Sequence, residues 1–227
     1  MKEVALTALT SILFLGVASC NPGPATGNPG TPKTSNLPKT KMKDQAVDAK
    51  EIPAGHETIT LGGGCFWCVE AVYQQLEGVH SAVSGYMGGW VPNPTYEQIC
   101  QKNTGHVEVV QLVFDPKKIP LADILAWYWE LHDPTTKDRQ GNDIGPQYAS
   151  VVFTHDDAQT AIVKASMAAA QETLYPGKPI VTEIKKASTF YKAEDYHQDF
   201  YFQNGATNGY CRAVIEPKLK KLKLKTK

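Results

Sequence analysis

Cysteine is scarce in this chain of 227 residues, which has five copies, and a second Cys-x-x-Cys pair is missing. A zinc ribbon would need that second pair, so no metal site is expected. Val69 follows Cys68, where c-type haem attachment requires a histidine. The chain also lacks net charge, with 23 basic and 23 acidic residues, so nucleic acid is not expected as a partner.

Long apolar runs are also missing after residue 20, where no stretch reaches the ~18 residues of a membrane span. The first twenty residues, "MKEVALTALTSILFLGVASC", have the early Lys, apolar stretch and small residues of a secretory signal. Their end, "VAS" before Cys20, resembles the lipobox of bacterial lipoproteins. That resemblance implies cleavage before Cys20 and acylation of its sulfur, whereas in an ordinary signal peptide Cys20 would be incidental. We expect an extracytoplasmic lipoprotein anchored in a membrane, in a periplasm or on a cell surface.

Composition divides the remainder into three parts. Residues 21–56 are rich in Pro, Gly, Thr and Asn, which predicts a flexible tether. Residues 57–215 contain the periodic apolar patterns of a folded domain. Residues 216–227, "EPKLKKLKLKTK", are interpreted as a basic tail that is either solvated or in contact with anionic lipid.

Strand-like and helix-like patterns alternate within the domain, which predicts an α/β or α+β fold in two layers. Residues 87–95 and 133–147 are long loops rich in Gly, Asn and Asp, and loops of that kind are often functional. Strands are predicted over residues 57–61, 79–86, 107–114, 148–153 and 179–185, and helices over residues 66–77, 121–132, 156–174 and 193–204.

The stretch "LGGGCFWCVE" contains the strongest candidate for a nucleophile. Cys65 follows three glycines and stands at a predicted helix start, where free N–H groups and the helix dipole stabilise a thiolate. The Cys65–Cys68 pair also suits a thioredoxin-like exchanger. The intervening Phe66 and Trp67 are bulky for that role and indicate the wall of an apolar pocket. Cys100 is interpreted as a small packed side chain.

Several longer motifs resemble the A-type peptide methionine sulfoxide reductases, the MsrA family. They are "GGGCFWCVE", "GYMGGWVPNPTYEQIC", "TGHVEVVQLVFDP", "WELHDPTTKDRQGNDIGPQYAS" and "AEDYHQDFY…NGYC", in order over residues 57–215. Many family members have Gly at the position of Cys68, so this chain is a CFWC variant. The resemblance implies a ferredoxin-like core with a mixed sheet. It also implies reduction of the S-epimer of methionine sulfoxide, free or in proteins, with no metal or organic cofactor and with electrons from thioredoxin or a similar dithiol.

The resemblance assigns the nucleophile and an acid. Cys65 would attack the sulfoxide sulfur as a thiolate, and Glu108 in "GHVE" would protonate the oxygen. A carboxyl group can donate a proton near neutral pH only when burial raises its pKa, and the apolar strand around Glu108 fits that need. Strand alternation alone would instead put Glu108 on a solvated face.

The resemblance also assigns the substrate contacts. Tyr96 and Tyr148 would hydrogen-bond the sulfoxide oxygen, although ordinary packing is the commoner role of Tyr. Asp143 would support the polar side of the site, and alone it would be interpreted as a turn residue. Phe66 and Trp67 would hold the ε-methyl group of the substrate.

A second thiol must convert the Cys65 sulfenic acid into a disulfide that a dithiol can reduce. Cys211 in "NGYC" occupies the family's recycling position, but the tail after it is not Gly-rich and is interpreted as a fixed strand. Cys68 is the alternative, and the sequence leaves both open. His106 is given a supporting role at most, and His132 and His197 are interpreted as structural.

Two other functions compete with the repair enzyme. One is a membrane-tethered thiol–disulfide exchanger that uses Cys65 and Cys68, and the other is a lipoprotein module without activity. An exchanger has no need of Glu108, Tyr96 and Tyr148 at the family's spacing, and an inactive module has no need of a reactive thiolate.

Overall fold

The structure is a computed structural model that describes residues 52–224 and Thr226. The signal-like segment, Cys20 and nearly all of the proposed tether lie outside the described residues. Within them, no helix is long and apolar enough to cross a membrane.

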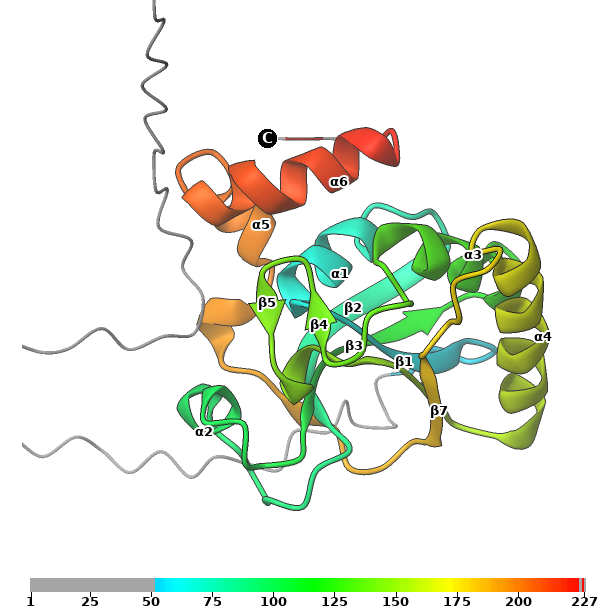
Figure 1. Cartoon of the computed structure of the whole chain (residues 1–227), viewed down its shortest axis with the longest axis horizontal. Helices are drawn as coiled ribbons and strands as arrows, with labels where there is room; N and C mark the ends of the chain where they lie inside the picture. The colour runs from blue at the N-terminus through cyan, green and yellow to red at the C-terminus, as the bar shows by residue number, and fades with distance from the viewer. Residues whose placement is uncertain (1–51, 225, 227) are drawn as a thin grey trace, which may run out of the picture.

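One twisted six-stranded sheet forms the centre of the domain (Figure 1). Its strand order is β7-β6-β1-β3-β2-β8, and all neighbours are antiparallel except the parallel pair β6 and β7. With α1 after β1 and α3 after β3, the strands β6-β1-β3-β2 form the predicted ferredoxin-like core, and the outer strand β7 makes the sheet mixed. The strands are β1 (Glu57–Gly63), β2 (Val79–Met87), β3 (Val107–Phe114), β6 (Ser150–Thr154), β7 (Glu183–Lys186) and β8 (Tyr191–Lys192).

Helices cover one face of this sheet, as Figure 1 shows for α1, α3 and α4. Helix α4 packs against α3 and the strands β6 and β7. The α-helices are α1 (Phe66–Tyr73), α2 (Tyr96–Cys100), α3 (Leu121–Leu131), α4 (Asp157–Thr173), α5 (Phe200–Asn204) and α6 (Glu216–Lys221). The short elements are β4 (Arg139–Gln140), β5 (Asp143–Ile144), the 3₁₀ turns η2 (Pro146–Tyr148) and η3 (Asp195–His197), and the π-helical η4 (Cys211–Ile215).

Every residue of β3 is buried, because both faces of the sheet are covered there. Val110 and Leu112 belong to the main core under the helices. Val107 and Val109 belong to a smaller cluster on the opposite face. Since side chains alternate along a strand, Glu108 shares the helix-covered face with Val110. The alternation that would have suggested a solvated Glu108 therefore directs it toward the core.

The C-terminal part differs from the sequence prediction. The single helix predicted over residues 193–204 is two pieces, η3 and α5, separated at Asp199, which has a left-handed φ of 52°. The segment after Cys211 is not a strand or a solvated tail but η4 followed by α6. Leu219 is fully buried and Leu222 is 8% exposed, so the folded domain extends past Ile215.

Candidate active site

Cys65 is the N-cap residue of α1, directly after β1 and the glycines. Gly64 has a φ of 87°, and a Cβ there would lie 2.6 Å from the side chain of Gln140. Glycine therefore allows both the turn and the close approach of the β4 segment. Cys65 is only 7% exposed, so the nucleophile sits in a closed site.

Cys65 and Cys68 form a hydrogen-bonded pair of thiols, and the Cys68 N–H donates to the Cys65 carbonyl at 3.1 Å. Burial raises the pKa of the Cys65 thiol, and the neighbouring Cys68 and Glu108 act in the same direction. The expected lowering of the Cys65 pKa by the helix start is therefore not found in the dithiol state. The hydrogen bond from Cys65 lowers the pKa of Cys68 to about 6. The two thiols thus hold one negative charge near neutral pH, and it belongs to the pair.

Glu108 is 2% exposed and lies beside this pair. Its Oε2 accepts a hydrogen bond from the Phe66 N–H, the first residue of α1, at 3.2 Å. Across the sheet it pairs with Tyr86, whose hydroxyl donates to Glu194 at 2.9 Å. A buried carboxyl group next to the nucleophile has the surroundings that a proton donor needs.

Phe66 and Trp67 form one wall of the site with residues from the C-terminal part. Trp67 stacks on Phe200 with a centroid distance of 3.7 Å and an interplanar angle of 7°. Its indole N–H donates to Nδ1 of His197 at 3.1 Å. The His197 ring also lies 5.0 Å from Phe66 and 4.5 Å from Tyr96. His197, interpreted as structural from the sequence, therefore joins three predicted site residues, and burial lowers its pKa to about 4 so that it stays neutral.

Tyr96, Tyr148 and Asp143 come from three separate elements. Tyr96 begins α2, and its N–H donates to Glu194 Oε1 at 2.8 Å. Tyr148 ends η2, which packs against β3, the strand of Glu108. Asp143 begins β5, and its Oδ2 accepts a hydrogen bond from the Tyr210 hydroxyl group. The sequence did not predict Tyr210 as a site residue.

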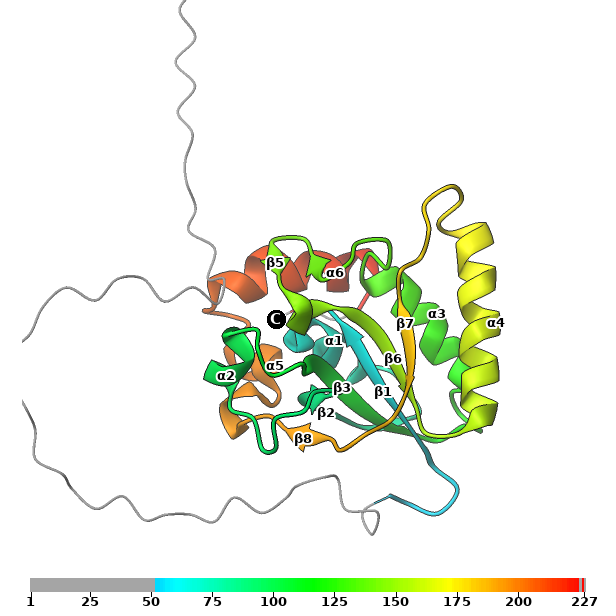
Figure 2. The ribbon, with the colours of Figure 1, turned by 60° about the horizontal axis from the view of Figure 1, so that its bottom comes forward.

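His106 fixes the loop that leads to Tyr96. Its Nδ1 accepts from the Gly89 N–H at 3.0 Å, so its Nε2 carries the proton and donates to the Val91 carbonyl at 2.8 Å. Figure 2 shows α2, α5 and β5 on the same side of the domain as the start of α1. The two long loops predicted to be functional therefore both end in site residues.

The sequence did not predict a role for Tyr210, because the motif "NGYC" was interpreted only through its cysteine. Its hydroxyl donates to Asp143 at 2.8 Å, lies 3.8 Å from the Cys68 sulfur and is hydrogen-bonded to Cys65. Asn208 supports this arrangement, since its Oδ1 accepts from the N–H groups of Tyr210 at 2.9 Å and Cys211 at 3.2 Å.

The other candidate thiol, Cys211, is fully buried in η4. Burial raises its pKa to about 11, and Cys68 and Glu216 add to the shift. Cys211 is therefore near Cys68, and it is protonated at neutral pH. None of the four cysteines in residues 52–224 is part of a disulfide, and Cys100 is half-buried at the end of α2.

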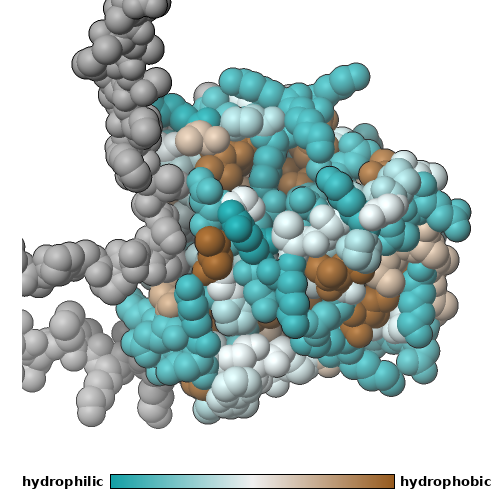
Figure 3. All heavy atoms as spheres, viewed as in Figure 1, coloured by the Kyte–Doolittle hydropathy of each residue, from teal (hydrophilic) through white to brown (hydrophobic). Residues whose placement is uncertain are grey.

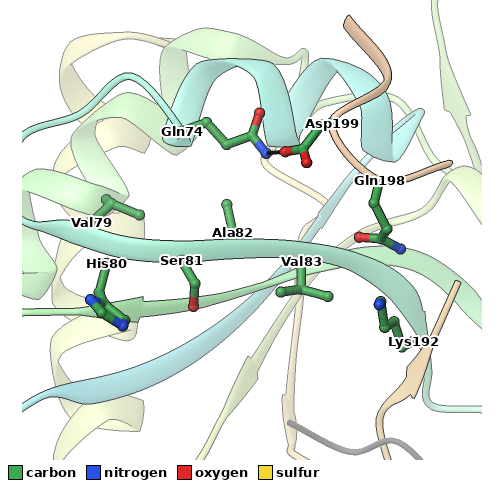
Figure 4. A pocket seen from close by; sticks show the side chains of 9 residues that line it. All are labelled: Gln74, Val79, His80, Ser81, Ala82, Val83, Lys192, Gln198 and Asp199. Carbon is green, nitrogen blue, oxygen red and sulfur yellow. Dashed lines mark hydrogen bonds between the residues drawn. The ribbon is translucent and has the colours of Figure 1, made fainter. Parts of the chain in front are cut away.

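The surface beside the site is mostly polar. Figure 3 shows separate apolar patches on a hydrophilic face. Three exposed apolar side chains are close in sequence to site residues, namely Trp90, Ile144 and Tyr196. A cavity of about 370 Å³ lies elsewhere, between Gln74, β2 and the η3–α5 link, and Figure 4 shows its mainly polar lining. That cavity contains no predicted site residue, and within the described part of the chain no three His, Cys, Asp or Glu residues are grouped to hold a metal ion.

The fold and site together define a two-layer α/β enzyme in which a buried thiol pair at a helix start adjoins a buried carboxyl group. The family model for "Peptide methionine sulfoxide reductase" matches residues 57–227. The chain therefore belongs to the peptide methionine sulfoxide reductase family, and it reduces methionine sulfoxide.

The chain is similar to several proteins of this family. MsrA of Polynucleobacter asymbioticus is 51% identical over 181 residues, which cover 80% of this chain and 94% of that protein. MsrA of Thermus thermophilus is 50% identical over 165 residues, covering 73% and 92%. Among solved structures, the reduced form of Mxr1 from Saccharomyces cerevisiae is 33% identical with a TM-score of 0.66, covering 70% and 91%. Methionine sulfoxide reductase A of Corynebacterium diphtheriae is 35% identical with a TM-score of 0.59, covering 66% and 76%.

Proposed function

We propose that Cys65 attacks the sulfur of methionine-S-sulfoxide, free or in proteins, while Glu108 gives a proton to the oxygen. The Cys65 thiolate and this proton convert the sulfoxide to methionine and leave Cys65 as a sulfenic acid. The thiol pair holds one negative charge, and transfer of the Cys65 proton to the Cys68 sulfur places that charge on Cys65 as the attacking thiolate. The observation that carries the proposal is the buried Glu108, bonded to the first N–H of α1 beside the nucleophile.

The substrate would lie between a polar end and an apolar wall. Tyr96 and Tyr148 bind the sulfoxide oxygen, and Asp143 supports that side of the site. Phe66 and Trp67 contact the ε-methyl group, with Trp67 held between Phe200 and His197. Contacts of this kind recognise the methionine side chain and little else, which suits an enzyme that repairs many proteins.

Cys68 then resolves the sulfenic acid. Its thiol is hydrogen-bonded to Cys65 in the dithiol state, whereas Cys211 is buried in η4 and is influenced by the charge of Cys68. The Cys68 sulfur bonds to the Cys65 sulfur, and the sulfenic hydroxyl leaves as water with the Cys68 proton. A thioredoxin-like dithiol returns the disulfide to two thiols, and the reaction needs no metal or organic cofactor.

A single turnover without reductant tests this proposal. The enzyme is mixed with one epimer of a methyl aryl sulfoxide, quenched with an alkylating agent and mapped by mass spectrometry. We expect one sulfide per enzyme and a Cys65–Cys68 bridge, with the S-epimer alone consumed. Absence of sulfide for both epimers would refute the assigned chemistry, and a Cys65–Cys211 bridge would refute Cys68 as the resolving thiol. Cys211→Ser is the matched control and should retain full turnover.

We also propose that the protein is a lipoprotein acylated at Cys20 and held outside the cytoplasm. The support is the signal-like sequence and the lipobox resemblance of residues 1–20. Disulfides persist in that compartment, so the reductant must be an extracytoplasmic or membrane-delivered dithiol. Metabolic labelling with a radioactive fatty acid should mark the full-length chain, and an unlabelled cytoplasmic product would contradict the proposal.

A further inference from the structure

The Tyr210 hydroxyl stands between Asp143 and the two reacting sulfurs. It donates to Asp143 Oδ2 at 2.8 Å and lies 3.8 Å from the Cys68 sulfur. It is also hydrogen-bonded to Cys65. Because its own hydrogen points to the carboxylate, its oxygen lone pairs are available to accept the S–H of a neighbouring thiol.

Formation of the Cys65–Cys68 disulfide, the second chemical step, requires that Cys68 lose its proton. In the dithiol state, the hydrogen bond from Cys65 is the largest influence on the Cys68 pKa and lowers it. Once Cys65 is a sulfenic acid, its S–H is gone, and burial, the next influence, raises the Cys68 pKa. Cys68 is then a buried neutral thiol, a weak nucleophile that needs a base.

Asp143 is the candidate for this base among the charged groups that influence Cys68. Lys218 on α6 and the Tyr210 hydroxyl both lower the pKa of Cys68, and Asp143 on β5 raises it. Burial also raises the pKa of Asp143 itself, while Tyr210 and Lys218 act against that shift. A carboxylate with a raised pKa accepts a proton more readily than an exposed one. Tyr210 connects Asp143 to the sulfur, because its hydroxyl donates to Asp143 and lies 3.8 Å from the Cys68 sulfur.

We propose that Tyr210 and Asp143 act as the general base for disulfide formation, with Tyr210 as a further catalytic residue. The Cys68 proton passes to the Tyr210 oxygen, and the Tyr210 hydrogen passes to Asp143. The Cys68 thiolate forms the S–S bond, and the S–O bond of the sulfenic acid breaks. The departing hydroxide recovers the proton from Asp143 and leaves as water, so protons and electrons balance. This inference rests on the proposed role of Cys68.

Tyr210→Phe is the decisive variant, because it removes only the hydroxyl group. In one turnover, sulfide release and disulfide formation are timed separately, with dimedone present to trap sulfenic acid. Wild-type enzyme should form the disulfide as fast as it releases sulfide. In Tyr210→Phe, disulfide formation should lag by at least about tenfold and Cys65 should become labelled by dimedone. The lag should shrink as pH rises, by about tenfold per pH unit below the Cys68 pKa.

A matched control and a second variant distinguish a catalytic role of Tyr210 from a general effect of losing a hydroxyl group. Tyr175→Phe removes another hydroxyl, which donates to the Trp129 carbonyl at 2.6 Å away from the sulfurs, and should change neither rate. Asp143→Asn should reproduce the pH-dependent lag, because the amide cannot take the proton. An unchanged ratio of the two rates and an unchanged pH profile in Tyr210→Phe would overturn the proposal. No sulfide from wild-type enzyme, or a bridge to Cys211, would instead overturn the proposed function.

Discussion

Glu108 and Cys65 are both nearly inaccessible, with 2% and 7% of their surfaces exposed. A closed site strengthens the interaction between an acid and a developing charge, because little water competes for either. The same burial disfavours a thiolate on Cys65. Buried negative charge at this site is therefore stabilised by a neighbouring donor. Cys65 hydrogen-bonds the Cys68 thiolate, and Tyr210 donates to the Asp143 carboxylate.

Replacing Glu108 by Gln tests the acid. The amide keeps the size of the side chain and can still accept the Phe66 N–H, but it cannot donate an acidic proton. We expect sulfide release in a single turnover to slow by about 10²- to 10⁴-fold, the usual contribution of a general acid. Glu57→Gln, at the exposed start of β1, is the control and should leave the rate unchanged. A slowing of less than threefold in Glu108→Gln would require another acid.

Glu70, the last residue of the "CFWCVE" motif, gives a prediction for stability. Burial raises the pKa of its carboxyl group to about 7, from an ordinary value of 4.5. The folded state therefore holds a proton that the unfolded state releases between these values, and the resulting stability is lost as pH rises through about 7. Glu70→Gln mimics the protonated form, so its free energy of unfolding relative to wild type should rise by about 3 kcal/mol from pH 4 to pH 8. Urea unfolding at both pH values measures it, and a constant difference would contradict the shift.

At the scale of elements, the break between η3 and α5 shows what local sequence patterns miss. The side-chain amide of Gln198 accepts from the Ser84 N–H and donates to the Ser84 carbonyl, as a neighbouring strand would. Asp199 then takes a left-handed conformation, and α5 starts with Phe200 stacked on Trp67. Helical periodicity over residues 193–204 cannot reveal this, because the partners lie more than 100 residues away. The strands and long helices were predictable because their own side chains alternate or repeat.

The C-terminal helix was predictable in principle. Ile215, Leu219 and Leu222 have helical spacing and all are buried, and Pro217 lies in the first turn of α6, where Pro is favoured. The run of lysines made the segment look like a solvated tail instead. The same contrast holds in the site. Cys65 was predicted from its place after three glycines at a helix start and Glu108 from a family motif, whereas the contacts of Tyr210 and His197 depend on how α1 packs against the C-terminal part.

Leu219→Ala tests whether α6 is part of the domain. Leu219 is fully buried, so its truncation should reduce the free energy of unfolding by about 2–5 kcal/mol. Disulfide formation should also slow relative to sulfide release, because Tyr210 adjoins the η4 and α6 unit that carries Lys218. The exposed Lys220→Ala is the control and should change stability by less than about 0.5 kcal/mol. Equal stabilities of the two variants in urea unfolding would restore the interpretation as a solvated tail.

At the scale of the whole molecule, reaction and localisation belong to different parts of the chain. Every proposed catalytic and substrate-binding residue lies between Cys65 and Cys211, within the family match over residues 57–227. The sequence features that suggest a membrane anchor lie in residues 1–20. The two properties should therefore be separable.

A chain shortened to residues 52–227 tests that separation. With a soluble dithiol as reductant, its kcat/KM should agree with that of the full-length protein within about twofold, because the main core and the site lie in residues it retains. In a bacterial host, the full-length protein should fractionate with membranes, since two or more acyl chains give stable anchoring. Cys20→Ser should lose this partition and keep its activity. A shortened chain with strongly reduced kcat/KM would show that residues 1–51 contribute to the site. A Cys20→Ser protein that stays in the membrane fraction would mean that the apolar leader, and not a lipid on Cys20, is the anchor.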